Sequence, residues 1–183
     1  MTFYPRIILP VLEKELEASE ITVITGMRQV GKTTLLDHLF NQIKTSNKVK
    51  LDFENPLNRK IFEEENYDAI WNNLANFGIN NQKKTYIFLD EIQHAPSIGS
   101  AVKYLRDHYE VKFVLTGSSS YYLKNLFSES MAGRKLIFEV YPLTFSEFLV
   151  FKEVTQRDLL SFSQKAASKN NISYSRLFPF YQE

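Results

Sequence analysis

The segment at residues 26–33, which reads GMRQVGKT, carries the clearest chemical signal in the sequence. It has the pattern of Gly, four residues and Gly-Lys-Thr, in which converging backbone N–H groups and one lysine surround a chain of phosphates. Gly26 and Gly31 allow the tight wrap of the backbone. Lys32 supplies a positive charge for the β- and γ-phosphates, and the hydroxyl of Thr33 can ligate magnesium. The segment therefore predicts a nucleotide-binding loop.

The other positions of this loop are also predicted to contact the nucleotide. Arg28, Gln29 and Val30 lie between the two glycines, and Thr34 offers a second hydroxyl near the α- and β-phosphates. Arg28 stands at a variable position of the pattern, so we expect it to brace the loop rather than to act in catalysis. An apolar run precedes the loop and an amphipathic pattern follows it, which is the context of a true phosphate loop.

Two adjacent carboxylates, Asp90 and Glu91, follow a second apolar run, at residues 86–89. Parallel strands deliver such residues to the sheet edge where ligands bind. Asp90 fits the coordination shell of magnesium, and Glu91 can orient and polarise an attacking water. The alternative is a solvated acidic turn, which is the better interpretation of an Asp-Glu pair that stands alone.

A third apolar run, at residues 111–115, leads into a turn rich in hydroxyl groups, TGSSS. Ser118 is our first candidate for a group that hydrogen-bonds the attacking water or the γ-phosphate, and Thr116 is the second. The alternative is that the turn only reverses the chain and caps the following helix, as serine often does.

ATP, with ADP as its product, is the predicted nucleotide. The sequence has neither an Asn-Lys-x-Asp element nor an Asp-x-x-Gly switch of the kind expected for guanine nucleotides. A phosphate-loop kinase is a further alternative, but such an enzyme has less need of a carboxylate like Glu91 to activate water.

Apolar runs alternate with helical patterns along most of the chain, and this alternation predicts a parallel sheet that helices cover on both faces. The expected strands span Ile21–Thr25, Val49–Phe53, Tyr86–Asp90, Val111–Thr116 and Leu136–Val140. The expected helices span Lys32–Lys44, Pro56–Glu65, Asp68–Phe77, Ile98–Tyr109 and Ser119–Phe127. We expect Val49–Phe53 to lie near an edge because its apolar residues alternate. The segment from Thr144 to Glu183 is expected to be helical.

Composition narrows the functional classes. The 183 residues carry a formal net charge of +1, which does not indicate general coating of nucleic acid. A small surface patch that contacts nucleic acid is compatible with this charge. No cysteine is present, so thiol chemistry and sulfur-based zinc sites are excluded and a reducing cytoplasm is expected. No apolar run approaches the roughly 20 residues of a membrane span.

These motifs, in this order, resemble those of AAA+ ATPases of a bacterial and archaeal group whose loop reads Gly-x-Arg-Gln-x-Gly-Lys-Thr. The resemblance rests on residues 26–36 (GMRQVGKTTLL), 89–93 (LDEIQ), 116–119 (TGSS), 133–134 (GR) and 141–148 (YPLTFSEF). It implies an α/β P-loop NTPase of three layers, α/β/α, with a five-stranded parallel sheet of order 5-1-4-3-2 and further C-terminal helices. It also implies Mg-ATP hydrolysis coupled to conformational change.

The resemblance further implies that Arg134 stabilises transition-state charge as an arginine finger, either in cis or in trans from a second copy in a homo-oligomer. An ion-paired surface arginine is the alternative.

Members of this group usually continue through a helical or winged-helix lid into another domain. We therefore expect a helical lead-in at residues 1–20, the nucleotide-binding core at 21–151, and the start of a lid or following domain, cut short, at 152–183. Without the lid residues, a nucleotide-regulated switch with little turnover is the alternative function.

Overall fold

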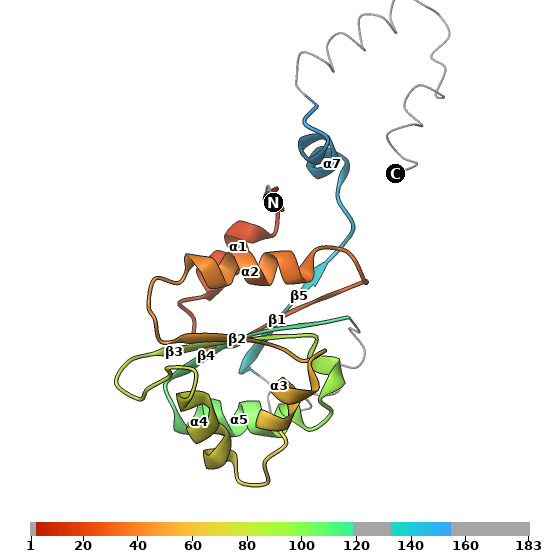
Figure 1. The fold of residues 1–183 in the computed structure, drawn as a ribbon. Helices are drawn as coiled ribbons and strands as arrows, with labels where there is room; N and C mark the ends of the chain where they lie inside the picture. The colour runs from red at the N-terminus through yellow and green to blue at the C-terminus, as the bar shows by residue number, and fades with distance from the viewer. Residues whose placement is uncertain (1–2, 119–132, 155–183) are drawn as a thin grey trace, which may run out of the picture. The chain divides into compact units, whose positions relative to one another are not determined.

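The computed structural model describes residues 3–118 and 133–154, and Figure 1 shows its ribbon. The chain consists of two compact units, one covering residues 3–142 and the other starting at Leu143. The helix expected at Ser119–Phe127 and the helical segment expected beyond residue 154 lie outside the described residues.

A five-stranded parallel sheet forms the centre of the first unit. Its strands are β1 (Ile21–Gly26), β2 (Lys48–Asp52), β3 (Thr85–Asp90), β4 (Val111–Gly117) and β5 (Lys135–Val140). They lie in the order β2-β3-β4-β1-β5. The predicted parallel sheet and its order, 5-1-4-3-2 read from the other edge, are confirmed.

The apolar patterns of the strands reflect their places in the sheet. Every residue of β1, β3 and β4, the three inner strands, is buried, because helices cover both faces there. The edge strand β2 alternates between buried and partly exposed residues, as the sequence predicted, and most of β5, at the other edge, is only partly buried.

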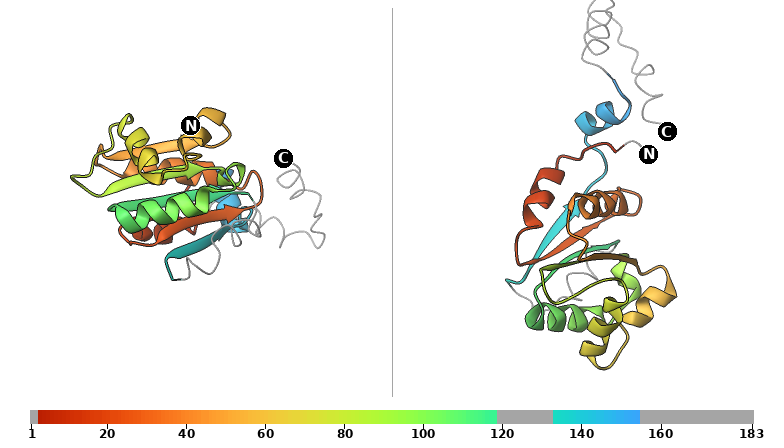
Figure 2. Two further views of the ribbon diagram at one scale, coloured as in Figure 1. Left: turned by 90° about the horizontal axis from the view of Figure 1, so that it is seen from below. Right: turned by 60° about the vertical axis from the view of Figure 1, so that its left-hand side comes forward.

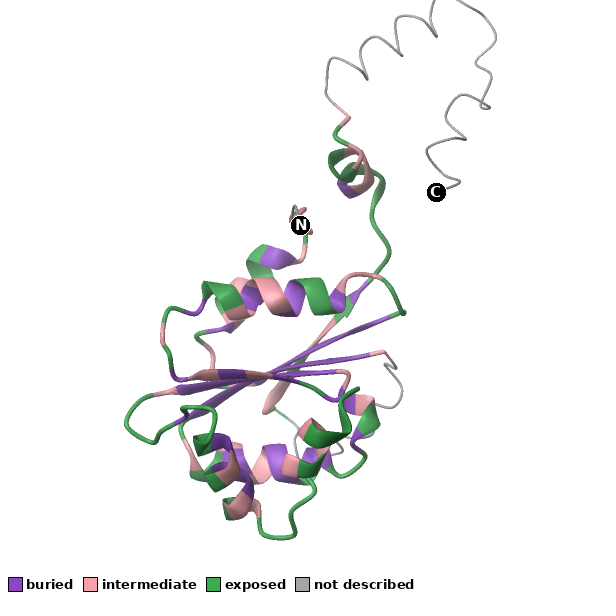
Figure 3. Ribbon diagram, viewed as in Figure 1, coloured by how far each residue is buried: buried purple, intermediate pink, exposed green. Residues whose placement is uncertain are grey.

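Helices cover the two faces unequally (Figure 1 and Figure 2). On one face lie α1 (Leu9–Glu15) and α2 (Lys32–Gln42), and on the other lie α3 (Pro56–Ile61), α4 (Tyr67–Ala75) and α5 (Ile98–His108). One apolar cluster fills the space under each set of helices, and Figure 3 shows the purple, buried residues concentrated there. The three predicted layers are therefore present.

Four helices end earlier than the sequence pattern indicates, α3 by four residues, α2 and α4 by two and α5 by one. The α2 helix stops at Gln42, because Ile43 turns to an extended conformation and the Nζ of Lys48 binds the carbonyls of Phe40 and Ile43 at 2.8 and 2.6 Å. The α3 helix stops at Ile61. Three consecutive glutamates follow at 63–65, and the side chain of Asn66 caps a separate helix, α4.

The described part of the second unit contains α7 (Phe145–Phe151). The side chain of Thr144 accepts a bond from the Glu147 N–H, and the Glu147 carboxylate accepts one from the Thr144 N–H, which forms a capping box. Across both units, none of the helices within residues 3–118 and 133–154 is long and apolar enough to span a bilayer.

Candidate active site

The predicted site residues other than Arg134 meet at the carboxyl edge of the sheet, because parallel strands all end there. The loop of residues 26–31 begins at Gly26, the last residue of β1. Asp90 is the last residue of β3 and Glu91 comes directly after it, while Ser118 comes directly after β4. An open pocket of about 400 Å³ lies at this edge. Its lining residues are Arg28, Gln29, Glu54, Glu91, Gln93, His94 and Ser118.

The backbone of the loop turns through three residues of positive φ: Gly26 at 144°, Gln29 at 64° and Gly31 at 93°. Gly26 also packs directly on β5, since a Cβ atom there would lie 2.2 Å from the carbonyl oxygen of Val140. Gly31 instead has space, with Arg6 Nη1 the nearest atom at 3.8 Å, and is required by its left-handed conformation at the start of α2. The two glycines therefore satisfy different constraints.

Lys32 is buried at the first position of α2. Its Nζ donates hydrogen bonds to the carbonyls of Gly26, at 3.2 Å, and Met27, at 2.8 Å, so the loop wraps around the ammonium group. Burial lowers the pKa of Lys32 below its ordinary value, while the nearby carboxylates of Glu91 and Asp90 act in the opposite direction. Lys32 is thus electrostatically coupled to the acidic pair.

Thr33 and Thr34 lie on the first turn of α2, and both are exposed. The first turn of a helix presents N–H groups that have no partner within the helix, together with the positive end of the helix dipole. This end of α2 can therefore receive an anion beside the two hydroxyls.

Asp90 is buried, and the hydroxyl of Thr116 on the neighbouring strand donates a hydrogen bond to its Oδ1. The same hydroxyl accepts a 3.1 Å bond from the N–H of Glu91. Thr116, our second candidate for contact with water or phosphate, is fully buried here and instead orients the acidic pair.

Glu91 lies in a left-handed backbone conformation, with φ of 54°. Its Oε2 accepts hydrogen bonds from Gln93 Nε2 and, at 3.0 Å, from Ser118 Oγ. Gln93 in turn accepts a 3.2 Å bond from the N–H of Ser118. These three residues form a closed triangle at the pocket, and the carboxylate is held by two donors.

Arg28 lies in the pocket rather than bracing the loop as we expected. Its charge is close enough to Lys32 to lower the pKa of that ammonium further, after the larger effects of burial and the two carboxylates. The brace is Arg6, whose Nη1 donates to the Val30 carbonyl at 2.7 Å.

Arg134 lies at the opposite edge of the sheet, immediately before β5. Its carbonyl accepts a bond from the N–H of Ile21, the first residue of β1, so about 20 Å of strand separates it from the loop. Its Nη1 pairs with Asp107 Oδ2 at 2.9 Å. The structure therefore contradicts a role in cis and contains the ion pair of our alternative. A role in trans stays a prediction.

Four residues near the site were not predicted from the sequence, and one of them is His94, which lines the pocket. Glu54 follows β2 at the carboxyl edge, and the rule that identified Asp90 would have identified it too. Gln93 stands within the LDEIQ motif, but nothing in the sequence links it to Ser118. Arg6 precedes the whole sheet, and no motif surrounds it.

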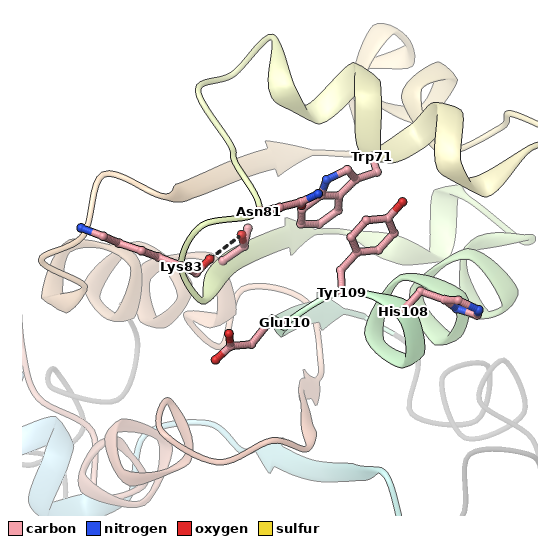
Figure 4. Close-up of a pocket in the computed structure, with 7 residues that line it drawn as sticks. Trp71, Asn81, Lys83, His108, Tyr109 and Glu110 are labelled. Carbon is pink, nitrogen blue, oxygen red and sulfur yellow. Dashed lines mark hydrogen bonds between the residues drawn. The ribbon is translucent and has the colours of Figure 1, made fainter.

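A second pocket, of about 230 Å³, lies at the amino edge of the sheet. Trp71 and Tyr109 stack there with ring centroids 4.0 Å apart. In Figure 4 the side chains of Lys83 and Glu110 point away from this aromatic pair, so charged groups do not converge as they do beside the loop. The candidate site is therefore the pocket at the carboxyl edge.

Comparison with known proteins identifies the family and the fold of the chain. Residues 18–149 match the family described as AAA domain. An uncharacterised protein of Haemophilus influenzae is 30% identical over 145 residues, which are 76% of this chain and 36% of that protein. One from Methanocaldococcus jannaschii is 31% identical over 155 residues, 85% of this chain and 34% of that protein. The chain thus spans about a third of the length of these relatives.

Solved structures share the fold at low sequence identity. The Aeropyrum pernix ORC1 protein, solved in complex with DNA, has a TM-score of 0.60 and 13% identity over 79% of this chain and 47% of its own. A DNA polymerase III gamma subunit-related protein from Thermotoga maritima has a TM-score of 0.51 and 15% identity over 79% and 49% of the two chains. On the family match and the shared fold, the chain belongs to the AAA domain family and has the architecture of AAA+ P-loop ATPases.

Proposed function

We propose that this chain binds Mg-ATP and hydrolyses the bond between its β- and γ-phosphates, with a change of conformation between the ATP and ADP forms. The observation that carries this proposal is that Lys32 lies near the carboxylates of Asp90 and Glu91 at one sheet edge. A cation for phosphate, a ligand for metal and a base for water are the three groups that this reaction needs.

The phosphates are proposed to lie in the loop from Gly26 to Gly31 and against the first turn of α2. Backbone N–H groups of that turn and the helix dipole favour an anion. Lys32 would exchange its bonds to the loop carbonyls for bonds to phosphate oxygens, and the exposed hydroxyl of Thr34 would add a contact. Arg28, Gln29 and Val30 complete the loop.

The residues present fit magnesium rather than a softer metal. Asp90 offers a carboxylate and Thr33 a hydroxyl, and oxygen ligands of this kind, together with phosphate and water, are those that magnesium prefers. Among residues 3–118 and 133–154, no three His, Asp or Glu side chains gather in a way that would form an all-protein metal site. Bound magnesium would neutralise charge on the phosphates.

Glu91 is the proposed group that orients and polarises the attacking water, and Ser118 the proposed partner that fixes it. Ser118 Oγ already donates to the Glu91 carboxylate, which leaves the other carboxylate oxygen, Oε1, for a water molecule. A solvated acidic turn, our alternative for the pair, is not supported, because Asp90 is buried and both carboxylates have specific donors.

A nucleotide-regulated switch with little turnover is the second candidate. It is favoured by the two donors on Glu91, which compete with water for that carboxylate. Under this proposal the same loop binds ATP or ADP, and only the rate of hydrolysis differs.

The partners proposed for the chain are ATP and, through Arg134 in trans, a second copy of itself. The similar ORC1 structure contains DNA, but the net charge of +1 gives no independent support for nucleic acid here. We propose the cytoplasm as the location, because the activity needs ATP and the absence of cysteine fits a reducing compartment.

Steady-state ATPase and equilibrium ATP-binding measurements test the proposal on the wild-type chain and two variants. Glu91→Gln is expected to reduce turnover at least about 100-fold while ATP binding survives, since only the base is removed. Lys32→Ala is expected to abolish binding. Wild-type binding without turnover would favour the switch, and Lys32→Ala binding at wild-type affinity would overturn both candidates.

A further inference from the structure

Arg6 joins two segments that are far apart in the sequence. Its Nη1 donates to the carbonyl of Val30, in the loop, and its Nη2 donates to the carbonyl of Tyr141, directly after β5, both at 2.7 Å. We infer that Arg6 is a positioning residue that shapes the phosphate loop and couples it to the carboxyl end of β5, and this inference rests on the proposed function.

The contact with Val30 sets the orientation of one loop peptide. Because a trans peptide is planar, its C=O and N–H point in opposite directions. Arg6 holds the Val30 carbonyl on its own side, and the N–H of Gly31 is thereby directed to the other. That N–H belongs to the set proposed to receive phosphate, so Arg6 pre-organises the anion site without touching it.

The other end of the loop is bound to the same part of β5. Gly26 packs against the carbonyl of Val140 so closely that a Cβ atom would lie 2.2 Å from that oxygen. Val140 and Tyr141 are consecutive, so both ends of the loop contact one short segment, through packing at Gly26 and through Arg6 at Val30. A movement of the loop is therefore transmitted to the place where the chain leaves the first unit, after Pro142.

The guanidinium group is suited to this task. Its two terminal nitrogens are fixed in one plane and reach two acceptors at once, whereas the single ammonium group of a lysine lacks that rigid fork. Arg6 precedes residues 18–149, the part of the chain that matches the AAA domain family, so the role belongs to the segment before the matched region.

The first experiment measures the dissociation constant of Mg-ATP for the full chain and for Arg6→Ala, Arg6→Lys and Arg106→Ala. We expect Arg6→Ala to raise the constant about tenfold through lost pre-organisation, and Arg6→Lys to raise it less. Arg106 is the matched control, because its Nε also donates to a backbone carbonyl, that of Ser19, at the opposite sheet edge. Arg106→Ala should leave the dissociation constant of Mg-ATP within about twofold of the wild-type value.

The second experiment tests the coupling and uses the absence of cysteine in the chain. Leu143→Cys introduces a single thiol two residues beyond the Arg6 contact, at a side chain that is 37% exposed. We expect saturating Mg-ATP to change the rate at which this thiol reacts with a maleimide. In the Arg6→Ala background, at saturating nucleotide, the change should become smaller, because only the packing of Gly26 on β5 then couples the two segments.

Each outcome decides between the proposals. Arg6→Ala that binds Mg-ATP as tightly as wild type, or an equal change of thiol reactivity in both backgrounds, overturns the inference and leaves the proposed function standing. If Arg6→Ala does not fold, as thermal unfolding would reveal, Arg6→Lys decides on the same criteria. A wild-type chain that binds no Mg-ATP overturns the proposed function itself.

Discussion

Ser118 Oγ donates a 3.0 Å hydrogen bond to Oε2 of Glu91, although the two residues are 27 positions apart in the sequence. The contact forms because β3 and β4 are neighbours and end at the same sheet edge. It ties the proposed base to the strand beside it, so the orientation of the Glu91 carboxylate depends on more than its own rotamer.

Ser118→Ala tests this contact. We expect turnover to fall about tenfold, less than the roughly 100-fold or more that a base contributes, because Gln93 still holds the carboxylate, while the ATP dissociation constant stays within about twofold. Steady-state kinetics and equilibrium binding separate the two quantities. Ser100→Ala, an exposed serine of α5, is the matched control and should change neither. An unchanged turnover number in Ser118→Ala would show that this hydrogen bond has no catalytic role.

Gln93→Glu changes the charge beside the same carboxylate. The new side chain still accepts from the N–H of Ser118, but when ionised it repels Glu91 instead of donating to it. Two adjacent carboxylates raise the pKa of one of them, so we expect the acidic limb of the ATPase pH profile to move to higher pH. The profile of His94→Gln, also at the pocket, should match wild type. Superimposable profiles for Gln93→Glu and wild type would refute the expectation.

Three glycine-to-alanine variants separate strain from packing. Gly26→Ala places a Cβ atom against the backbone of β5, and we expect it to lower the free energy of unfolding by about 2–4 kcal/mol. Gly31→Ala suffers only the strain of positive φ, about 1–2 kcal/mol. Gly78→Ala has similar strain, with nothing within 4 Å, and lies outside the site. Denaturant unfolding should rank Gly26→Ala as the most damaging, and equal losses in all three would contradict the packing argument.

Lys112 gives the folding stability a dependence on pH. It is fully buried in β4, its Nζ donates to the Glu20 carbonyl and to Thr22 Oγ1, and burial lowers its pKa to about 8. Between about pH 8 and 10.5 the unfolded chain therefore binds more protons than the folded chain, and stability rises with pH in that window. Denaturant unfolding at pH 8 and 9.5 measures this slope.

Lys112→Met should flatten the slope, because the titrating group is removed. The same change at exposed Lys60 is the control and should leave the slope as in wild type. The measurements stay below pH 10, because burial and the bond to Asp68 raise the pKa of Tyr109 to about 12. Tyr109 therefore lowers stability as pH rises above the ordinary tyrosine value of 10, against the effect of Lys112. If the slope persisted in Lys112→Met, the pH dependence of stability would come from other titrating groups.

Arg134 has a test that separates an ion pair from a role in trans. As a half-exposed pair with Asp107, it should contribute less than about 1 kcal/mol to stability. If Arg134 acts on the site of a second copy, Arg134→Ala should bind ATP normally and hydrolyse it slowly. Mixing it with Lys32→Ala should then restore part of the activity, because one interface would combine an intact site with an intact arginine. No recovery on mixing, with Asp107→Asn as a control for the ion pair, would leave Arg134 a structural residue.

The sequence was sufficient for most of the fold. All five strands were placed to within one residue at each end. The runs at residues 21–25, 86–90 and 111–116 are short and mostly apolar, as expected for strands buried on both faces. Helix ends were less predictable. The end of α2 depends on Lys48 reaching back to its last carbonyls, which is a contact between separate elements and leaves no local signal.

The sequence by itself determined which chemical groups are available: a phosphate-loop pattern, two carboxylates after one strand and a hydroxyl-rich turn after another. The tertiary structure decided which of them meet. It joined both Ser118 and Gln93 to Glu91, engaged Thr116 with Asp90, and gave the bracing role to Arg6 rather than Arg28. It also placed Arg134 at the far edge, although its motif suggested the site. The physical reason is that motifs report local backbone requirements, whereas the order and direction of strands fix the distances between residues that are remote in sequence.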